Sequence, residues 1–159
     1  MLRSFFQGYY NNQKATDESM DSEGFVKTGD IGYIKQNGFV YVVDRKKDIF
    51  KYKGDHITPS EIESVIEKME QVEFVTVVGI PDAETYNLPA AVIKKKKGFQ
   101  QLTEDEVIKF VADRLPDYKQ LHGGVYFVDE MPMTKNDKIL KREALKIAVE
   151  IFKGKQNKK

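Results

Sequence analysis

Residues 58–80 read TPSEIESVIEKMEQVEFVTVVGI, and this stretch decides the fold because a helix signal is followed directly by a strand signal. Thr58 precedes a proline and has a glutamate, Glu61, three residues on, which predicts a helix N-terminus with a capping box. Apolar residues then recur at helical spacing, so we expect a helix over 59–69 with one buried face. The run 72–80 is rich in valine and predicts a strand.

The same two kinds of pattern continue on both sides of this stretch. Upstream, the β-rich runs 31–34 and 39–43 are joined through an Asn-Gly pair, which predicts a hairpin. Downstream we expect a strand, a helix with a second capping box, a short buried strand, a loop and a final amphipathic helix, over residues 88–94, 103–115, 125–128, 129–137 and 139–153. The fold class is therefore α+β: a two-stranded hairpin followed by a small mixed sheet flanked by about three helices.

Composition limits the class of protein. The chain has 159 residues, of which 40% are hydrophobic and 32% charged, so it is long enough for about one folded domain. Its apolar runs are too short to cross a bilayer, and its first residues do not predict a secretory signal. Without cysteine there are no disulfides or thiol chemistry. The two histidines, His56 and His122, lie in no cluster, so we expect no metal site.

Charge is balanced overall but uneven along the chain. The net charge of +1 argues against a strong nucleic-acid binder. Residues 141–159 nevertheless carry seven Lys and Arg against two Glu. A basic end of this kind is typical of a solvated tail, and binding to phosphate or an anionic surface is the alternative. A nucleic-acid binder driven by this tail would be released from DNA steeply as salt rises.

A domain boundary is predicted at 44–48, where apolar strand residues give way to five consecutive charged residues. The alternative interpretation is a charged exit from a hairpin. We expect residues 1–44 to be the incomplete end of one domain, irregular over 1–27. Residues 45–155 form a second domain in this prediction, and 156–159 a disordered basic tail.

Three side chains could carry chemistry. Asp30 follows Thr-Gly just before a strand, where a carboxylate can accept hydrogen bonds from two neighbouring hydroxyls, although such a sequence also marks ordinary turns. Arg45 offers a planar fork of donors to a sugar or carboxylate, or is a surface arginine. Lys138 lies in a polar loop at the start of the last helix. A charge aimed there at an anionic oxygen is worth roughly 10²–10³ in rate, and the alternative is a solvated lysine.

Several sequence blocks, taken together and in order, resemble the adenylate-forming (AMP-binding) enzyme superfamily. The likeness is to the branch of 4-coumarate-CoA ligases, insect luciferases and luciferase-like fatty acyl-CoA ligases, and specifically to the C-terminal domain. It extends over nearly the whole chain, in blocks at residues 8–12, 15–16, 24–30, 44–63, 79–82, 88–91, 123–125 and 132–138.

The resemblance implies two half-reactions. A fatty or aromatic carboxylic acid and ATP, with Mg²⁺, form an acyl-adenylate, and CoA then forms the thioester. Asp30 and Arg45 would contact the ATP ribose, and Lys138 would serve the first half-reaction. Lys47 would be the hinge about which the small domain rotates. The rotation would bring up a thioester-forming face made by Lys51, Lys53 and Gly54.

The chain departs from the family pattern at three positions. Asp137 stands where glycine is usual, and its charge could hold the ammonium of Lys138 away from substrate. Asp55 replaces an aromatic residue and His56 replaces glutamine or arginine, on the thioester-forming face. The last residues are not Ser-Lys-Leu, so we expect an intracellular, cytoplasmic protein, with a peroxisomal location suggested only by analogy with the family.

The resemblance covers the C-terminal end of such an enzyme only. The chain contains no Gly-x-x-x-x-Gly-Lys-Ser/Thr loop, and nothing in it resembles the family's phosphate-gripping loop, adenine pocket or acyl tunnel. We therefore expect a fragment that is inactive alone, binds neither ATP nor CoA tightly, and works with an N-terminal domain or a full-length ligase. The alternative is a non-catalytic interaction module that keeps the fold.

Overall fold

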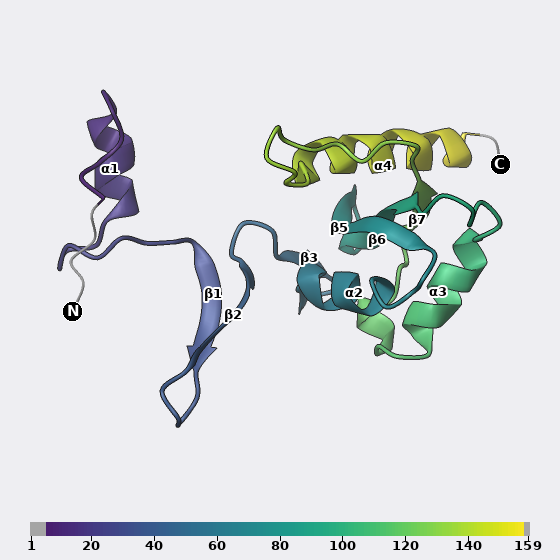
Figure 1. Ribbon diagram of the computed structural model, residues 1–159, viewed down its shortest axis with the longest axis horizontal. Coiled ribbons are helices and arrows are strands. Elements are labelled where there is room, and N and C mark those ends of the chain that lie inside the picture. The colour runs from purple at the N-terminus through teal and green to yellow at the C-terminus, as the bar shows by residue number, and fades with distance from the viewer. Residues whose placement is uncertain (1–5, 158–159) are drawn as a thin grey trace. The chain divides into compact units, whose positions relative to one another are not determined.

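The computed structural model describes residues 6–157 and consists of two compact units. They divide between Lys47 and Asp48, and we call the described residues before and after this point unit 1 and unit 2. Figure 1 shows unit 1 in purple and blue and unit 2 in teal to yellow. None of the described helices is long and apolar enough to cross a membrane.

Unit 1 contains one short helix and one hairpin. Strands β1 (Asp30–Ile34) and β2 (Val40–Arg45) pair antiparallel, which confirms the predicted hairpin. Helix α1 (Gln13–Ser19) corrects the prediction that residues 1–27 are irregular, of which 1–5 lie outside the described part. The helix forms because the side chain of Asn12 accepts a hydrogen bond from the amide of Ala15 and so caps its N-terminus.

The hairpin of unit 1 is apolar on both faces. Side chains alternate along a strand, so one face carries Ile34, Val40 and Val42, and the other carries Ile31, Tyr33 and Tyr41. The two tyrosine rings stack with centroids 5.3 Å apart. All six side chains are exposed, and the two hydrophobic clusters found among the described residues both belong to unit 2.

Unit 2 is built on a three-stranded mixed sheet, as predicted. Its order is β5-β6-β7, with β5 and β6 antiparallel and β6 and β7 parallel. Two helices cover one face and the third covers the other (Figure 1). The bounds are β5 Val72–Asp82, β6 Tyr86–Lys95, β7 Gly124–Phe127, α2 Pro59–Ile66, α3 Glu104–Ala112, a short 3₁₀ helix η1 Asp117–Lys119, and α4 Lys141–Gln156.

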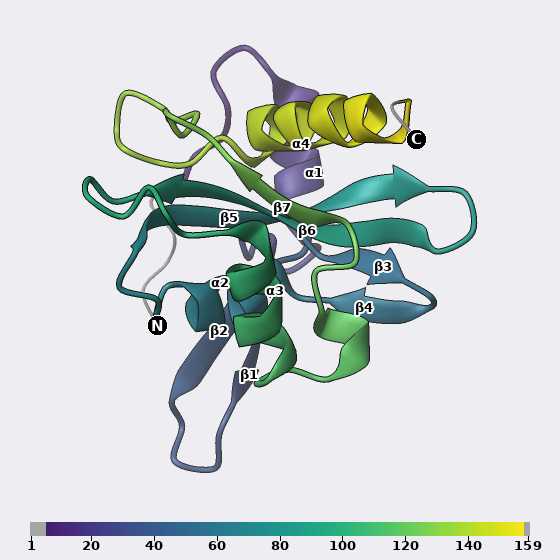
Figure 2. The ribbon, with the colours of Figure 1, turned by 90° about the vertical axis from the view of Figure 1, so that its right-hand side faces the viewer.

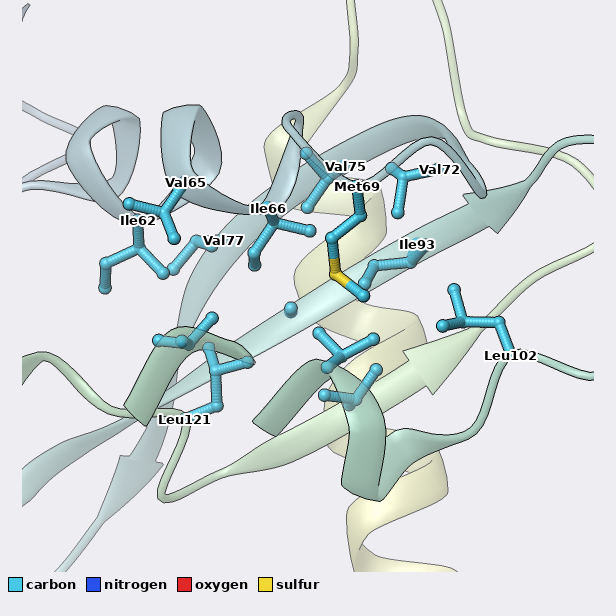
Figure 3. Close-up of a cluster of buried hydrophobic side chains, with 14 of the residues drawn as sticks. Ile62, Val65, Ile66, Met69, Val72, Val75, Val77, Ile93, Leu102 and Leu121 are labelled. Carbon is cyan, nitrogen blue, oxygen red and sulfur yellow. The ribbon is translucent and has the colours of Figure 1, made fainter. Parts of the chain in front are cut away.

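The sheet separates two hydrophobic clusters. The first lies under α2 and α3, where Ile62 and Ile66 point from α2 into the layer between the helix and the sheet (Figure 3). The second lies under α4, where Ala144 and Ala148 are fully buried. The larger residues Leu145, Val149 and Phe152 of the same helix pack against this cluster and are only partly buried.

Two predictions for helix α2 differ from the structure. Helix α2 ends at Ile66, and a tighter turn follows in which the Met69 amide bonds the Ile66 carbonyl at 2.9 Å. Thr58 makes no capping hydrogen bond, and the Glu61 carboxylate instead pairs with Lys119 of η1 at 2.7 Å. At α3, in contrast, the predicted capping box of Thr103 is present.

Strand predictions need two corrections. A second hairpin, β3 (Phe50–Tyr52) and β4 (Asp55–Ile57), lies where none was predicted. Pro81-Asp82 and Asn87, predicted to join two strands, belong to the strands themselves, and the turn occupies residues 83–85. The Asp82 carboxylate closes this turn by accepting from the amide and hydroxyl of Thr85, and these bonds lower the pKa of Asp82.

Candidate active-site residues

The structure brings Asp30 and Arg45 together at the open end of the β1–β2 hairpin. They are cross-strand partners, and Arg45 Nε lies 2.7 Å from Asp30 Oδ1. The amide of Asp30 donates to the hydroxyl of Thr28 at 3.2 Å, which fixes the turn before the strand. A carboxylate has acceptor positions on both oxygens, so Asp30 can also accept from a pair of hydroxyls.

Lys47 lies in the turn that follows β2 and is exposed. It is the last residue of unit 1. The predicted hinge therefore falls where the two compact units divide.

The β3–β4 hairpin presents Lys51, Lys53 and Gly54, which are all exposed. Its two-residue turn has positive φ at both central residues, 48° at Lys53 and 94° at Gly54, as a type I′ turn requires. The tip is also tied to the turn between β5 and β6, because the Lys53 amide donates to the Thr85 carbonyl at 3.0 Å. The side-chain amide of Asn87 donates to the Lys51 carbonyl at 3.0 Å.

An aromatic support lies beneath this hairpin. Tyr52 is buried and its ring stacks on His122, with centroids 4.8 Å apart. His122 Nε2 lies 2.7 Å from the Asp117 carbonyl, which ties the imidazole ring to η1. Sequence reasoning missed the hairpin, whose only signal was a Lys-Gly pair between two short runs.

Lys138 lies on a small hairpin that precedes α4, not at the helix start as predicted. The amide of Thr134 donates to the Lys138 carbonyl at 2.8 Å, and the amide of Asp137 donates to the Thr134 carbonyl at 3.1 Å. Met133 and Ile139 form an isolated antiparallel bridge just below. We call residues 132–140 the Lys138 hairpin. Lys138 follows the turn at residues 135–137 and is exposed.

Asp137 has a left-handed backbone, with φ of 55°. This is a conformation that glycine adopts freely and that aspartate tolerates better than most other residues. The hydrogen bonds of Asp137 and Lys138 to Thr134 form with aspartate in place. The substitution is therefore compatible with the turn that presents Lys138.

Lys138 and the β3–β4 hairpin are not brought together. In Figure 2 the segment before α4 extends to one side of the sheet, while β3 and β4 lie towards the other. Both belong to unit 2, so one packed body presents two separate sets of lysines. Among residues 6–157 no group of three or more His, Cys, Asp or Glu could hold a metal ion.

Shifted pKa values in unit 2 belong to contacts that hold the fold together. Burial, assisted by the charge of Glu104, raises the pKa of Tyr126 to about 12, and its hydroxyl donates to the Gly123 carbonyl at 2.6 Å. Burial alone would lower the pKa of Lys119, but the hydrogen bond and charge of Glu61 raise it. A hydrogen bond from Lys94 to Glu130 at 3.2 Å raises the pKa of Lys94.

Known proteins share much of this sequence. It is 40% identical over 155 residues to luciferin 4-monooxygenase of Luciola mingrelica, which covers 98% of this chain and 27% of that protein. It is 37% identical to peroxisomal OPC-8:0-CoA ligase 1 of Arabidopsis thaliana, covering 91% of this chain and 26% of the ligase. The chain thus spans about a quarter of the length of these relatives.

Solved structures show the same fold. ATP-bound MatB from Rhodopseudomonas palustris matches with a TM-score of 0.83 and 30% identity, over 92% of this chain and 29% of that one. The o-succinylbenzoate CoA synthetase MenE of Bacillus subtilis, in complex with its acyl-adenylate OSB-AMP, matches with a TM-score of 0.77 and 30% identity. That match covers 87% of this chain and 28% of MenE.

Unit 2 has the α+β fold of the C-terminal domain of adenylate-forming enzymes. The family model described as AMP-binding enzyme C-terminal domain matches residues 61–138. Residues 61–138 belong to this family, and the relatives of the chain include a luciferin 4-monooxygenase and a probable 4-coumarate-CoA ligase.

Proposed function

We propose that the chain is the C-terminal part of an ATP-dependent, AMP-forming acyl-CoA ligase and serves both of its half-reactions. The observation that carries the proposal is the separation of the Lys138 hairpin and the β3–β4 hairpin on one packed unit. A domain that rotates between two half-reactions uses two such faces in turn. The division of the chain beside Lys47 supports a hinge there.

ATP would be oriented by the pair at the open end of the β1–β2 hairpin. Asp30 would accept hydrogen bonds from the two ribose hydroxyls, while Arg45 holds the carboxylate in place through their 2.7 Å contact. Carboxylate and guanidinium fit a sugar diol because they supply acceptors and donors side by side. Mg²⁺ would neutralise phosphate charge and be held by the triphosphate together with groups outside this chain.

In the first half-reaction Lys138 would act on the reacting groups. An oxygen of the substrate carboxylate attacks the α-phosphorus of ATP, the bond to the β-phosphate oxygen breaks, and pyrophosphate leaves. The Lys138 ammonium is a compact point charge that would hold the attacking carboxylate against the phosphate and offset the growing negative charge. Its exposed place beside the turn of the hairpin would let it reach into an active site formed by the N-terminal domain.

In the second half-reaction the face made by Lys51, Lys53 and Gly54 would replace Lys138. The CoA thiol attacks the acyl carbon, the bond to the adenylate oxygen breaks, and AMP leaves. The turn at Lys53-Gly54 is fixed by its bond to Thr85, so it would present a rigid edge to CoA. Gly54 adds no side chain there, which lets the edge approach closely.

The acid is selected outside this chain, and a fatty or aromatic acid is the substrate class that we propose. The chain would be inactive alone and would work with an N-terminal domain or a full-length ligase. A cytoplasmic location is proposed, with the peroxisome as the alternative. A non-catalytic interaction module is the second candidate function, favoured by the unusual Asp137 beside Lys138.

Pyrophosphate release tests this function. The chain is mixed with ATP and a panel of fatty and aromatic acids, with and without a luciferase-like N-terminal domain supplied separately. We expect release only when both parts are present. Acyl-adenylate formation by the chain alone would contradict the proposal. No pyrophosphate release from the mixture of folded parts would favour the interaction module.

Three variants of the Lys138 hairpin sharpen this test. Lys138→Ala should lower adenylation by roughly 10²–10³. Lys135→Ala, which removes an exposed lysine from the same hairpin, is the matched control and should leave the rate near that of the parent. Asp137→Gly should change it little, because the turn already forms with aspartate; a large gain would indicate that Asp137 damages the loop.

A further inference from the structure

Glu63 joins three elements of unit 2 through one carboxylate oxygen. It projects from α2, and its Oε1 accepts hydrogen bonds from the Val77 amide at 2.8 Å and the Thr76 hydroxyl at 3.1 Å, both on β5. The same oxygen lies 3.0 Å from Nζ of Lys141, the first residue of α4. Only 15% of the Glu63 side chain is exposed, so water screens the ion pair little.

This carboxylate caps an edge of the sheet. Strand β5 pairs with β6 alone among the described strands, so the opposite side of β5 has free backbone groups. The Val77 amide points to that side, because it bonds Glu63. Helices α2 and α4 cover opposite faces of the sheet, and Glu63 connects them around this edge.

Lys141 lies next to the base of the Lys138 hairpin. It lies three residues after Lys138, a span of at most about 10 Å. Between them, the Leu140 amide donates to the Pro132 carbonyl at 2.8 Å and closes the hairpin. Helix α4 has no side-chain cap, because Leu140 occupies the N-cap position. A lysine near a helix N-terminus is disfavoured by the helix dipole, so it needs a partner such as Glu63.

We infer that the Glu63–Lys141 ion pair is a positioning device that holds the Lys138 hairpin in the orientation needed for adenylation. The inference rests on the proposed function, because it gives Glu63 and Lys141 a role in the first half-reaction only. The β3–β4 hairpin is held separately, by Thr85 and Asn87. Loss of the ion pair should therefore affect one face of unit 2 and leave the other intact.

Lys141→Met is the decisive variant. It keeps the length and the apolar stem of the side chain but removes the charge, and Glu63 keeps its hydrogen bonds to Thr76 and Val77. Lys141→Arg, which can still pair with Glu63, should restore the parent behaviour. The matched control is Lys155→Met, which breaks the 2.8 Å ion pair with Glu104 at the other end of the same helix.

The first readout uses the chain as it is and needs no activity. Amide hydrogen exchange is measured at Asp137, Lys138 and Leu140, with the free energy of unfolding measured in parallel. In Lys141→Met we expect exchange at these amides to become several-fold faster than any loss of global stability accounts for, and no such change in Lys141→Arg or Lys155→Met. Unchanged exchange in Lys141→Met would overturn the inference. So would an acceleration spread equally over all of unit 2, because that reports a purely structural role.

The second readout separates the half-reactions in the reconstituted enzyme. Lys141→Met should lower kcat for pyrophosphate release by roughly tenfold to a hundredfold, since displacing a reacting group by about 1 Å costs up to that much. The KM for ATP and the rate of thioester formation from supplied acyl-adenylate should stay near the parent values. An equal loss in both half-reactions, or none in either, would overturn the inference. If the parent shows no adenylation, the proposed function fails instead, and the exchange result still decides whether the ion pair holds the hairpin.

Discussion

Unit 1 and unit 2 use similar residues in opposite ways. The β1–β2 hairpin of unit 1 exposes valines, isoleucines and tyrosines on both faces, whereas the valines and isoleucines of β5 and β6 lie in two packed clusters. A two-stranded hairpin is marginal in water unless another surface covers it. The difference teaches that unit 2 carries the stability of the described chain, and that unit 1 presents surface suited to a further layer of protein.

The largest expected effect is a difference in the free energy of unfolding between one substitution in unit 2 and one in unit 1. Ile66→Ala in α2 removes a fully buried side chain and should lower the free energy of unfolding by about 2–5 kcal/mol, because the cavity cannot collapse completely. Val42→Ala in β2, where 66% of the residue is exposed, should change it by less than about 0.5 kcal/mol. Denaturant titration of both variants measures the contrast. Similar losses in the two variants would contradict the view that the packed clusters of unit 2 supply most of the free energy of unfolding.

The next effect tests the support of the thioester-forming face. Gly79 lies on β5 under the Phe50 ring, and an added Cβ would come within 2.7 Å of that ring. Gly79→Ala should therefore cost about 1–3 kcal/mol by overpacking and should push β3 away from the sheet. Denaturant titration gives the loss, and amide exchange at Lys53 reports whether the hairpin moves. Gly154→Ala, where an added Cβ meets nothing within 4 Å, is the control; a full loss of stability without faster exchange at Lys53 would contradict the displacement of β3.

Much of the fold could be predicted because its signals are local. The Asn-Gly hairpin, the capping box at Thr103 and the long valine-rich strand are each fixed by neighbouring residues. The β3–β4 hairpin could not be predicted, since each strand has only three residues. Its turn places Lys53 in a conformation that sequence statistics give to Asn or Gly, and tertiary bonds to Thr85 hold it there.

Likewise, only some residues of the candidate site could be predicted from the sequence. Asp30, Arg45 and Lys138 could be selected by residue type and by resemblance, and the structure adds that Asp30 and Arg45 touch. Glu63 could not be selected, because its partners Val77 and Lys141 lie on elements distant in sequence. Helical periodicity indicates only that Glu63 is a polar residue beside a buried face. The edge of β5 that it caps exists only once the sheet has formed.

A smaller effect tests the exposed surface of unit 1. Val42→Thr and Ile34→Thr replace apolar groups on one face of the hairpin and should reduce the binding of a hydrophobic dye. Both side chains are exposed, so stability should stay within about 0.5 kcal/mol of the parent. Lys35→Gln, a polar change in the same hairpin, is the control for an effect of charge on dye binding. Undiminished dye fluorescence in both threonine variants would show that the dye binds another surface.

The smallest expected effect is a loss of stability of unit 2 as the pH falls. Hydrogen bonds from the backbone amide and then the hydroxyl of Thr103 lower the pKa of Glu106 from its ordinary value of 4.5. Because the folded pKa is the lower one, the unfolded chain binds the proton first as pH falls. The stabilisation is therefore complete above the unfolded pKa and is lost as the pH falls through the folded value.

Denaturant midpoints measured at several pH values between about 6 and 3 should show this loss as a slope. Glu106→Gln keeps the capping geometry but cannot titrate, so its slope should be smaller than that of the parent. Thr103→Ala removes the hydroxyl and keeps the backbone amide, which makes the larger contribution to the lowered pKa, so it should retain most of the parent slope. Because the other carboxylates titrate in both proteins, the difference between the slopes of the parent and Glu106→Gln reports the contribution of Glu106. An identical slope in the glutamine variant would mean that the cap of α3 contributes nothing to acid sensitivity, and that the loss arises elsewhere in the chain.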